Sequence, residues 1–148
     1  MLFRSFGTVT QPRAGVVSVN TNGTLTYVPP SNFSGTIVFP YTLTQGGAST
    51  TANVTITVLP KAINDSLSVI GGSTTYVDAL INDVCATCTI ISATTPSGGS
   101  RTIATDGLSM NYQAPASGGP FTFQYTIQDR NGNTSTATVT IKIGRAHV

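Results

Sequence analysis

The strongest constraint on this chain is a pattern of residues that occurs twice along the sequence. Its anchor residues recur about 85 positions later. The matched anchors are Tyr27 and Tyr112, Tyr41 and Tyr125, and Ala52 and Ala137. Three separate anchors at one spacing are hard to produce by biased composition alone. The chain is therefore predicted to contain two copies of one structural unit in tandem.

The second copy has a leading portion, residues 62–88, for which the first copy has no counterpart. Residues 8–10 of the first copy correspond to residues 90–93, well inside the unit. We therefore expect a truncated repeat over residues 1–59 and a complete repeat over residues 60–143, with the junction at Pro60-Lys61. Residues 144–148 resemble the translation of a widely used sequencing adapter, and we interpret them as an artefact rather than a natural tail.

Each segment of the pattern alternates between apolar and polar residues, which is typical of a half-buried β-strand. In the second copy, one row is expected to face inward and the other to face water. The inward row is Phe121, Phe123, Tyr125 and Ile127, and the outward row is Thr122, Gln124 and Thr126. Turn-forming dipeptides separate the segments, among them Asn22-Gly23, Gly46-Gly47, Asp106-Gly107 and Asn131-Gly132. The sequence predicts an all-β fold, namely an antiparallel Greek-key β-sandwich in two tandem units, the first truncated.

The composition agrees with extended β structure and excludes some partners. Charged residues make up only 8% of the sequence, and threonine is the most frequent residue type. The branched Cβ of threonine suits a pleated surface, and its hydroxyl keeps the outer face wet. The net charge of +2 comes from scattered cations without a basic stripe, so nucleic acid is not an expected partner. No apolar run approaches the ~18 residues of a membrane helix, so we expect no membrane insertion within this sequence.

The sequence also lacks the combinations of side chains that common hydrolytic mechanisms require. The acidic residues are five Asp with no Glu, mostly in turn contexts, which does not suggest paired carboxylates in contrasting environments. The single histidine, His147, falls in the adapter-like end, so no histidine base is available for acyl transfer by a serine. We predict that the chain is not an enzyme.

Several spaced motifs resemble a known group of proteins. The first copy carries a G-x-L-x-Y-x-P-x-x-x-F-x-G block from Gly23 to Gly35, followed by Phe39, Tyr41 and Leu43. The matching residues of the second copy are Gly107, Tyr112, Pro115, Phe123, Tyr125, Ile127, Asp129, Ala137, Val139 and Ile141. In these residues the chain resembles the bacterial Ig-like and cadherin-like tandem repeats of very large secreted surface proteins, the adhesins.

That resemblance implies a non-catalytic structural or adhesive module in an extracellular surface protein, acting as a spacer or an adhesion unit. The implied partners are neighbouring repeats of the same chain and an unidentified surface protein or glycan. The alternative is a ligand-binding or carbohydrate-binding accessory module of a secreted enzyme. Such modules usually expose aromatic platforms, and here only Tyr76 has no expected core role. We expect Tyr27 and Tyr112 to place their rings in the core and to bond backbone near a loop.

The resemblance also implies calcium, because related cadherin-like arrays hold calcium at unit junctions through carboxylates and carbonyls. Calcium takes six to eight oxygen ligands. The candidate ligands are Asn64, Asp65, Asn82, Asp83 and Asp129. The alternative for the Asn-Asp pairs is a turn-forming role, in which the side chains bond their own backbone. The acidic loop that often follows the second pair in the family is replaced here by residues 84–88.

Cys85 and Cys88 form a Cys-x-x-Cys motif within that replacement. A thioredoxin-like role needs a βαβ context, and a zinc site needs a second pair of ligands. In an oxidising exterior the motif favours a local disulfide that pins the loop. Two free or buried thiols are the alternative.

Overall fold

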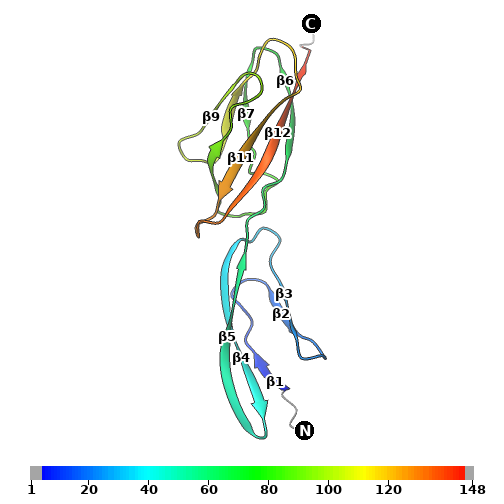
Figure 1. Ribbon diagram of the computed structural model, residues 1–148, viewed down its shortest axis with the longest axis vertical. Helices are drawn as coiled ribbons and strands as arrows, with labels where there is room; N and C mark the ends of the chain where they lie inside the picture. Colours follow the sequence, from blue (N-terminus) through cyan, green and yellow to red (C-terminus); the bar gives the residue numbers. More distant parts are fainter. Residues whose placement is uncertain (1–4, 146–148) are drawn as a thin grey trace. The chain divides into compact units, whose positions relative to one another are not determined.

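The computed structural model describes residues 5–145, and the regular structure within them is entirely β (Figure 1). Contacts between strands divide the chain into two compact units, residues 1–58 (unit 1) and residues 59–148 (unit 2). Within the described part, no helix has the length and apolar character needed to cross a membrane. Residues 1–4 and 146–148, which include His147, lie outside the described residues.

Unit 2 is a sandwich of two sheets. One sheet has the strand order β6-β12-β11-β8 and the other has the order β7-β10-β9. The strands are β6 (Asp65–Ile70), β7 (Thr74–Val77), β8 (Thr89–Ala93), β9 (Ser100–Ile103), β10 (Met110–Gln113), β11 (Phe121–Gln128) and β12 (Thr134–Gly144). The chain changes sheet after β6, β7, β8 and β10, which gives the expected Greek-key type of connection.

The core of unit 2 lies between these sheets, as the alternating pattern predicts. Phe123, Tyr125 and Ile127 of β11 are buried, Phe121 is half-buried against the same core, and their polar neighbours are more exposed. From the opposite sheet, Tyr112 is fully buried and its ring stacks on Phe123 with centroids 6.0 Å apart. The inward row expected for β11 is therefore confirmed.

One pairing in unit 2 differs from the antiparallel expectation, because β6 runs parallel to β12. Asp65 pairs with Val139 and Ile70 with Gly144. All the other ladders are antiparallel. The period-two pattern does not reveal this, because parallel and antiparallel strands alternate their faces in the same way. The pairing also extends β12 through Gly144, within the stretch interpreted as adapter-derived.

Unit 1 has the same plan with fewer strands. One sheet has the order β1-β4-β5, and β2 pairs with β3 in a second sheet. The strands are β1 (Ser5–Val9), β2 (Val16–Val19), β3 (Leu25–Val28), β4 (Gly35–Gln45) and β5 (Ala48–Val58). Among the described residues of unit 1, no strand corresponds to β6 or β7 of unit 2.

The two units share their strand registers. In β4 and β5, Phe39 pairs with Val54, and in β11 and β12, Phe123 pairs with Val139. The ladders β1–β4 and β8–β11 also carry a register shift at the same place. The internal repeat therefore reflects one strand arrangement that is built twice.

The repeat also preserves a hydrogen bond from a tyrosine to a loop. Tyr27 donates its hydroxyl to Ala14 O at 3.1 Å, and Tyr112 donates to Gly98 O at 2.6 Å. A glycine follows each acceptor residue, and Gly99 has a φ of 79°. A Cβ at Gly99 would lie 2.3 Å from Gln113 O, so a side chain is excluded there. The loop role expected for both tyrosines is confirmed.

Candidate functional site

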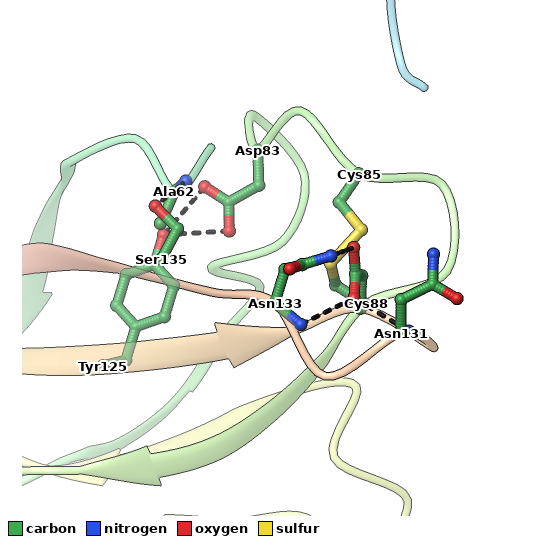
Figure 2. Close-up of a disulfide and its surroundings, with 9 residues drawn as sticks. Ala62, Asp83, Cys85, Cys88, Tyr125, Asn131, Asn133 and Ser135 are labelled. Carbon is green, nitrogen blue, oxygen red and sulfur yellow. Dashed lines mark hydrogen bonds between the residues drawn. A yellow bond between two sulfur atoms is a disulfide. The ribbon is translucent and has the colours of Figure 1, made fainter. Parts of the chain in front are cut away.

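A cluster of oxygen atoms surrounds the hydroxyl of Tyr125 at one end of unit 2 (Figure 2). This oxygen lies 2.9 and 3.1 Å from the Asp83 carboxylate oxygens, 3.0 Å from Ile63 O and 3.1 Å from Ala79 O. A tyrosine hydroxyl has one proton to donate, so these acceptors compete for it. Asp83 Oδ1 also accepts the Ile63 N–H at 2.7 Å. The cluster thus ties the leading segment of unit 2 and the segment that follows β7 to β11.

Burial sets the charge state of this cluster. Burial raises the pKa of Asp65 to about 6, and the charges of Asp83 and Asp78 add to that rise, while Tyr125 and Asn82 oppose it. Asp65 Oδ2 is buried without a hydrogen-bond partner. Burial also raises the pKa of Asp83, against the bonds from Ile63 N–H and Tyr125. The pKa of Tyr125 is raised far above its ordinary value, chiefly by burial and then by its bond to Asp83, so the hydroxyl stays neutral and donates.

The remaining predicted ligands serve backbone roles in the structure. Asn64 Oδ1 accepts the Thr138 N–H at 2.9 Å, and Asn82 Nδ2 donates to Asn64 O at 3.3 Å. Asp129, which is 6% exposed, accepts the backbone N–H groups of Asn131 and Asn133, both at 2.9 Å. Its other oxygen accepts Asn133 Nδ2 at 3.0 Å.

The structure therefore gathers only part of the predicted ligand set. Asp83 accepts a hydrogen bond from the Tyr125 hydroxyl and its charge raises the pKa of the Asp65 carboxyl, whereas Asp129 is committed to the turn between β11 and β12. Within residues 5–145, no group of three or more His, Cys, Asp or Glu side chains is placed to hold a metal ion. The hydrogen bond from the Tyr125 hydroxyl to Asp83 is not predicted by the sequence patterns. A buried tyrosine needs a partner for its hydroxyl, and that requirement was the available signal.

The loop that follows this cluster carries a disulfide. Cys85 and Cys88 are joined, with Cα atoms 5.6 Å apart (Figure 2). Cys88 is buried against the core of unit 2, and Cys85 packs at its margin. Cys88 also lines a shallow pocket of about 430 Å³ together with Asp129, so the disulfide loop lies beside the turn that Asp129 organises.

Unit 1 presents a different feature, an apolar groove. The groove has a volume of about 380 Å³ and is lined by side chains from β1, β3, β4 and β5. Leu25, Tyr27, Tyr41, Val54 and Ile56 are among the lining residues, and all five are partly exposed. Their positions match core positions of unit 2, so this is a core face that the described residues leave open.

Two facing β-sheets with Greek-key connections and a repeated tyrosine-to-loop bond define an immunoglobulin-like sandwich. The sequence matches the bacterial Ig domain family over residues 2–57 and again over residues 59–142. The chain therefore belongs to the bacterial Ig domain family.

Comparison with solved structures returns other multidomain proteins. An endo-fucoidan hydrolase from glycoside hydrolase family 107 is 18% identical, with a TM-score of 0.43, and the match covers 99% of this chain and 24% of that protein. A Bacteroides ovatus mixed-linkage glucan utilization locus protein, SGBP-B in complex with a mixed-linkage heptasaccharide, is 14% identical. Its TM-score is 0.28, with coverage of 95% of this chain and 37% of that one.

Cadherin domains are also among the matched structures. Extracellular cadherin domains 1–4 of protocadherin gamma B7 are 11% identical, with a TM-score of 0.33 and coverage of 96% of this chain and 41% of that one. The chain thus spans well under half the length of these three proteins. No curated protein matches the sequence significantly.

Proposed function

We propose that the chain is a non-catalytic, load-bearing spacer in a large extracellular surface protein. The observation that carries this proposal is the parallel pairing of β6 with β12, the first and last strands of unit 2. The chain enters unit 2 beside Asp65 and leaves beside Gly144, at opposite ends of that ladder. Tension applied through the chain ends would therefore load the hydrogen bonds of the ladder together, in shear, rather than one after another.

Force spectroscopy on the full chain, tethered at both ends, tests this proposal. Unit 2 is expected to unfold in one step that releases about 300 Å of chain, at ~3.4 Å per residue. Unit 1 is the internal control, because among its described residues β5 pairs only with β4 and no parallel ladder is available. Unit 2 should resist a higher force than unit 1. Unfolding of unit 2 at the same force or a lower one would contradict the spacer proposal.

Glycan binding is the second candidate function, and one exposed aromatic residue favours it. Tyr76 lies on β7 with 60% of its surface exposed, whereas Tyr112 and Tyr125 are fully buried. An exposed ring on a strand can stack on a sugar face. A glycan array that includes fucoidan and mixed-linkage glucan would detect such binding. Loss of that binding on Tyr76→Ala, with Tyr76→Phe retaining it, would support a carbohydrate-binding role over a spacer role.

Calcium binding at unit 2 remains a further proposal. Its support is the unpartnered Asp65 Oδ2 together with the carbonyl oxygens of Ile63 and Ala79, which are hard oxygen ligands of the kind calcium takes. Thermal unfolding of the full chain, with millimolar calcium and then with a chelator, tests it. At about 100 times Kd, linkage predicts roughly 2.7 kcal/mol of stabilisation. A shift that survives Asp65→Asn would contradict a site at this carboxylate.

A further inference from the structure

The outward face of the three-stranded sheet of unit 2 carries an exposed tyrosine among polar side chains. In the register of this sheet, Asn111 of β10 lies opposite Tyr76 on one side and opposite Thr102 on the other. We call these residues the Tyr76 row. All of them are exposed, with 60% of the Tyr76 surface accessible. Since residues directly opposite on antiparallel strands have Cβ atoms about 5 Å apart, the row spans roughly 10 Å.

The polar groups of the Tyr76 row are available to a ligand. Within the described residues, no hydrogen bond joins the side-chain amide of Asn111 or the hydroxyl of Thr102 to another group. By contrast, the amide of Gln113 in the next row donates to Gly72 O at 2.9 Å and accepts from Thr74 Oγ1. A side-chain amide offers N–H donors and a carbonyl acceptor. Asn111 is therefore equipped to bind the hydroxyl groups of a ligand in both directions.

The charges near the Tyr76 row determine which ligands it favours. The only basic residue of β7, β9 and β10 is Arg101, and its guanidinium donates to Ala93 O and Thr94 O at the end of β8. Asp78 lies two positions after Tyr76 and is exposed. Its carboxylate repels sulfate, phosphate and uronate groups, whereas it accepts hydrogen bonds from hydroxyls. The row therefore favours an uncharged ligand that is rich in hydroxyl groups.

We propose that the Tyr76 row binds a neutral glycan of β-linked glucose units, an inference that rests on the glycan-binding candidate given above. A glucose ring with equatorial hydroxyls presents axial C–H groups on its faces, and the exposed ring of Tyr76 can stack on such a face. A β-linked chain is extended, so the next sugar would lie over Asn111, whose amide bonds its hydroxyls. Thr102 would continue these contacts. The glycan would therefore cross the strands of the sheet.

An NMR titration of the full chain with a mixed-linkage β-glucan oligosaccharide tests both the site and the class of ligand. We expect the largest changes in chemical shift at the side-chain amide of Asn111 and at the backbone amides of Tyr76 and Thr102. The side-chain amide of Gln124 is the internal control, because it is exposed on the other sheet, opposite Thr138. At low ionic strength, a sulfated fucoidan oligosaccharide should bind at least about tenfold more weakly than the glucan.

Matched variants at exposed positions assign the binding to the Tyr76 row. Asn111→Ala should weaken glucan binding about three- to tenfold, because hydrogen bonds to sugar hydroxyls are lost. Gln124→Ala removes an exposed amide of the same kind from the other sheet and should leave the affinity unchanged. Asp78→Asn should narrow the preference for glucan over fucoidan, since the amide of asparagine does not repel sulfate groups.

Two results would overturn this inference and leave the glycan-binding candidate in place. The first is glucan binding that shifts Gln124 rather than Asn111, or that survives Asn111→Ala, because the site would then lie elsewhere. The second is tighter binding of fucoidan than of glucan, which would reverse the class of ligand. Absence of binding to every glycan tested would overturn the inference and the glycan-binding candidate together. The spacer proposal is tested separately, because it concerns the ladder between β6 and β12.

Discussion

The two units of this chain have the same registers but differ in how completely they are covered. Tyr112 and Tyr125 of unit 2 are fully buried, whereas Tyr27 and Tyr41, which share their strand positions, are partly exposed. The difference lies in β6 and β7, which close both sheets of unit 2 and have no counterpart in the described part of unit 1. The ladders have the same registers in both units, whereas the matched core residues are fully buried only in unit 2, where β6 and β7 are present.

The largest expected effect comes from truncating the repeated tyrosine in each unit. Tyr112→Ala should destabilise unit 2 by about 3–5 kcal/mol, because it removes a fully buried ring and leaves Gly98 O without its donor. Tyr27→Ala should cost unit 1 clearly less, because its ring is only partly buried. Hydrogen exchange on the full chain in increasing urea reports on each unit separately. If Tyr112→Ala and Tyr27→Ala lowered the unfolding free energy of their units equally, the difference in burial between the two tyrosines would be contradicted.

A smaller effect is expected from removing one hydroxyl. Tyr125→Phe leaves Asp83 with fewer partners in a buried site, so unit 2 should lose about 1–3 kcal/mol. Tyr41→Phe is the matched control, since unit 1 has no acidic residue to accept from that hydroxyl. Urea titrations followed by hydrogen exchange compare the two variants. A loss from Tyr41→Phe as large as that from Tyr125→Phe would show that Asp83 is not the reason.

Reduction of the disulfide should lower the stability of unit 2 but not that of unit 1. The Cys85–Cys88 bridge closes a short loop, and the chain-entropy relation gives at most about 2 kcal/mol for it. Dithiothreitol should therefore lower the unfolding free energy of unit 2 by up to that amount and leave unit 1 unchanged, because residues 1–58 contain no cysteine. Thiol counting by mass spectrometry under non-reducing conditions shows whether Cys85 and Cys88 are joined before dithiothreitol is added. Two free thiols there would contradict the disulfide.

The smallest effect concerns pH. The folded-state pKa of Asp65 is raised to about 6, so the folded state holds its proton more tightly than the unfolded state. Unit 2 should therefore lose stability as pH rises from about 4 to about 6, with the loss complete above that range. The raised pKa of Asp83 acts in the same direction. Because Asp65 is partly exposed, solvent screening keeps the change modest.

Asp65→Asn should flatten this pH profile in unit 2. Unit 1 is again the internal control, since residues 1–58 contain neither a carboxylate side chain nor a histidine. Chemical denaturation at pH 4, 5, 6 and 7, monitored by hydrogen exchange at matched intrinsic rates, gives both profiles at once. A rise in unit 2 stability over that range would contradict the sign assigned to Asp65.

Local patterns in the sequence were enough to predict much of this fold. Alternation identified the inward row of Phe123, Tyr125 and Ile127, because a strand turns successive side chains to opposite faces. The loop bonds of Tyr27 and Tyr112 were also predicted, because a tyrosine with its ring in the core needs a partner for its hydroxyl.

Only the tertiary structure decided which strands meet and which residues share a buried site. The parallel pairing of β6 with β12 joins segments more than 70 residues apart, and no local period reports such a choice. Alternation along β7 does not say which of its two faces is inward, and packing decides this by burying Val77 and exposing Tyr76. The bond between Tyr125 and Asp83 likewise depends on the tertiary fold, because it joins β11 to the segment between β7 and β8, 42 residues away in the sequence. Strand faces are a property of the local backbone, whereas partners and charge states are properties of the assembled core.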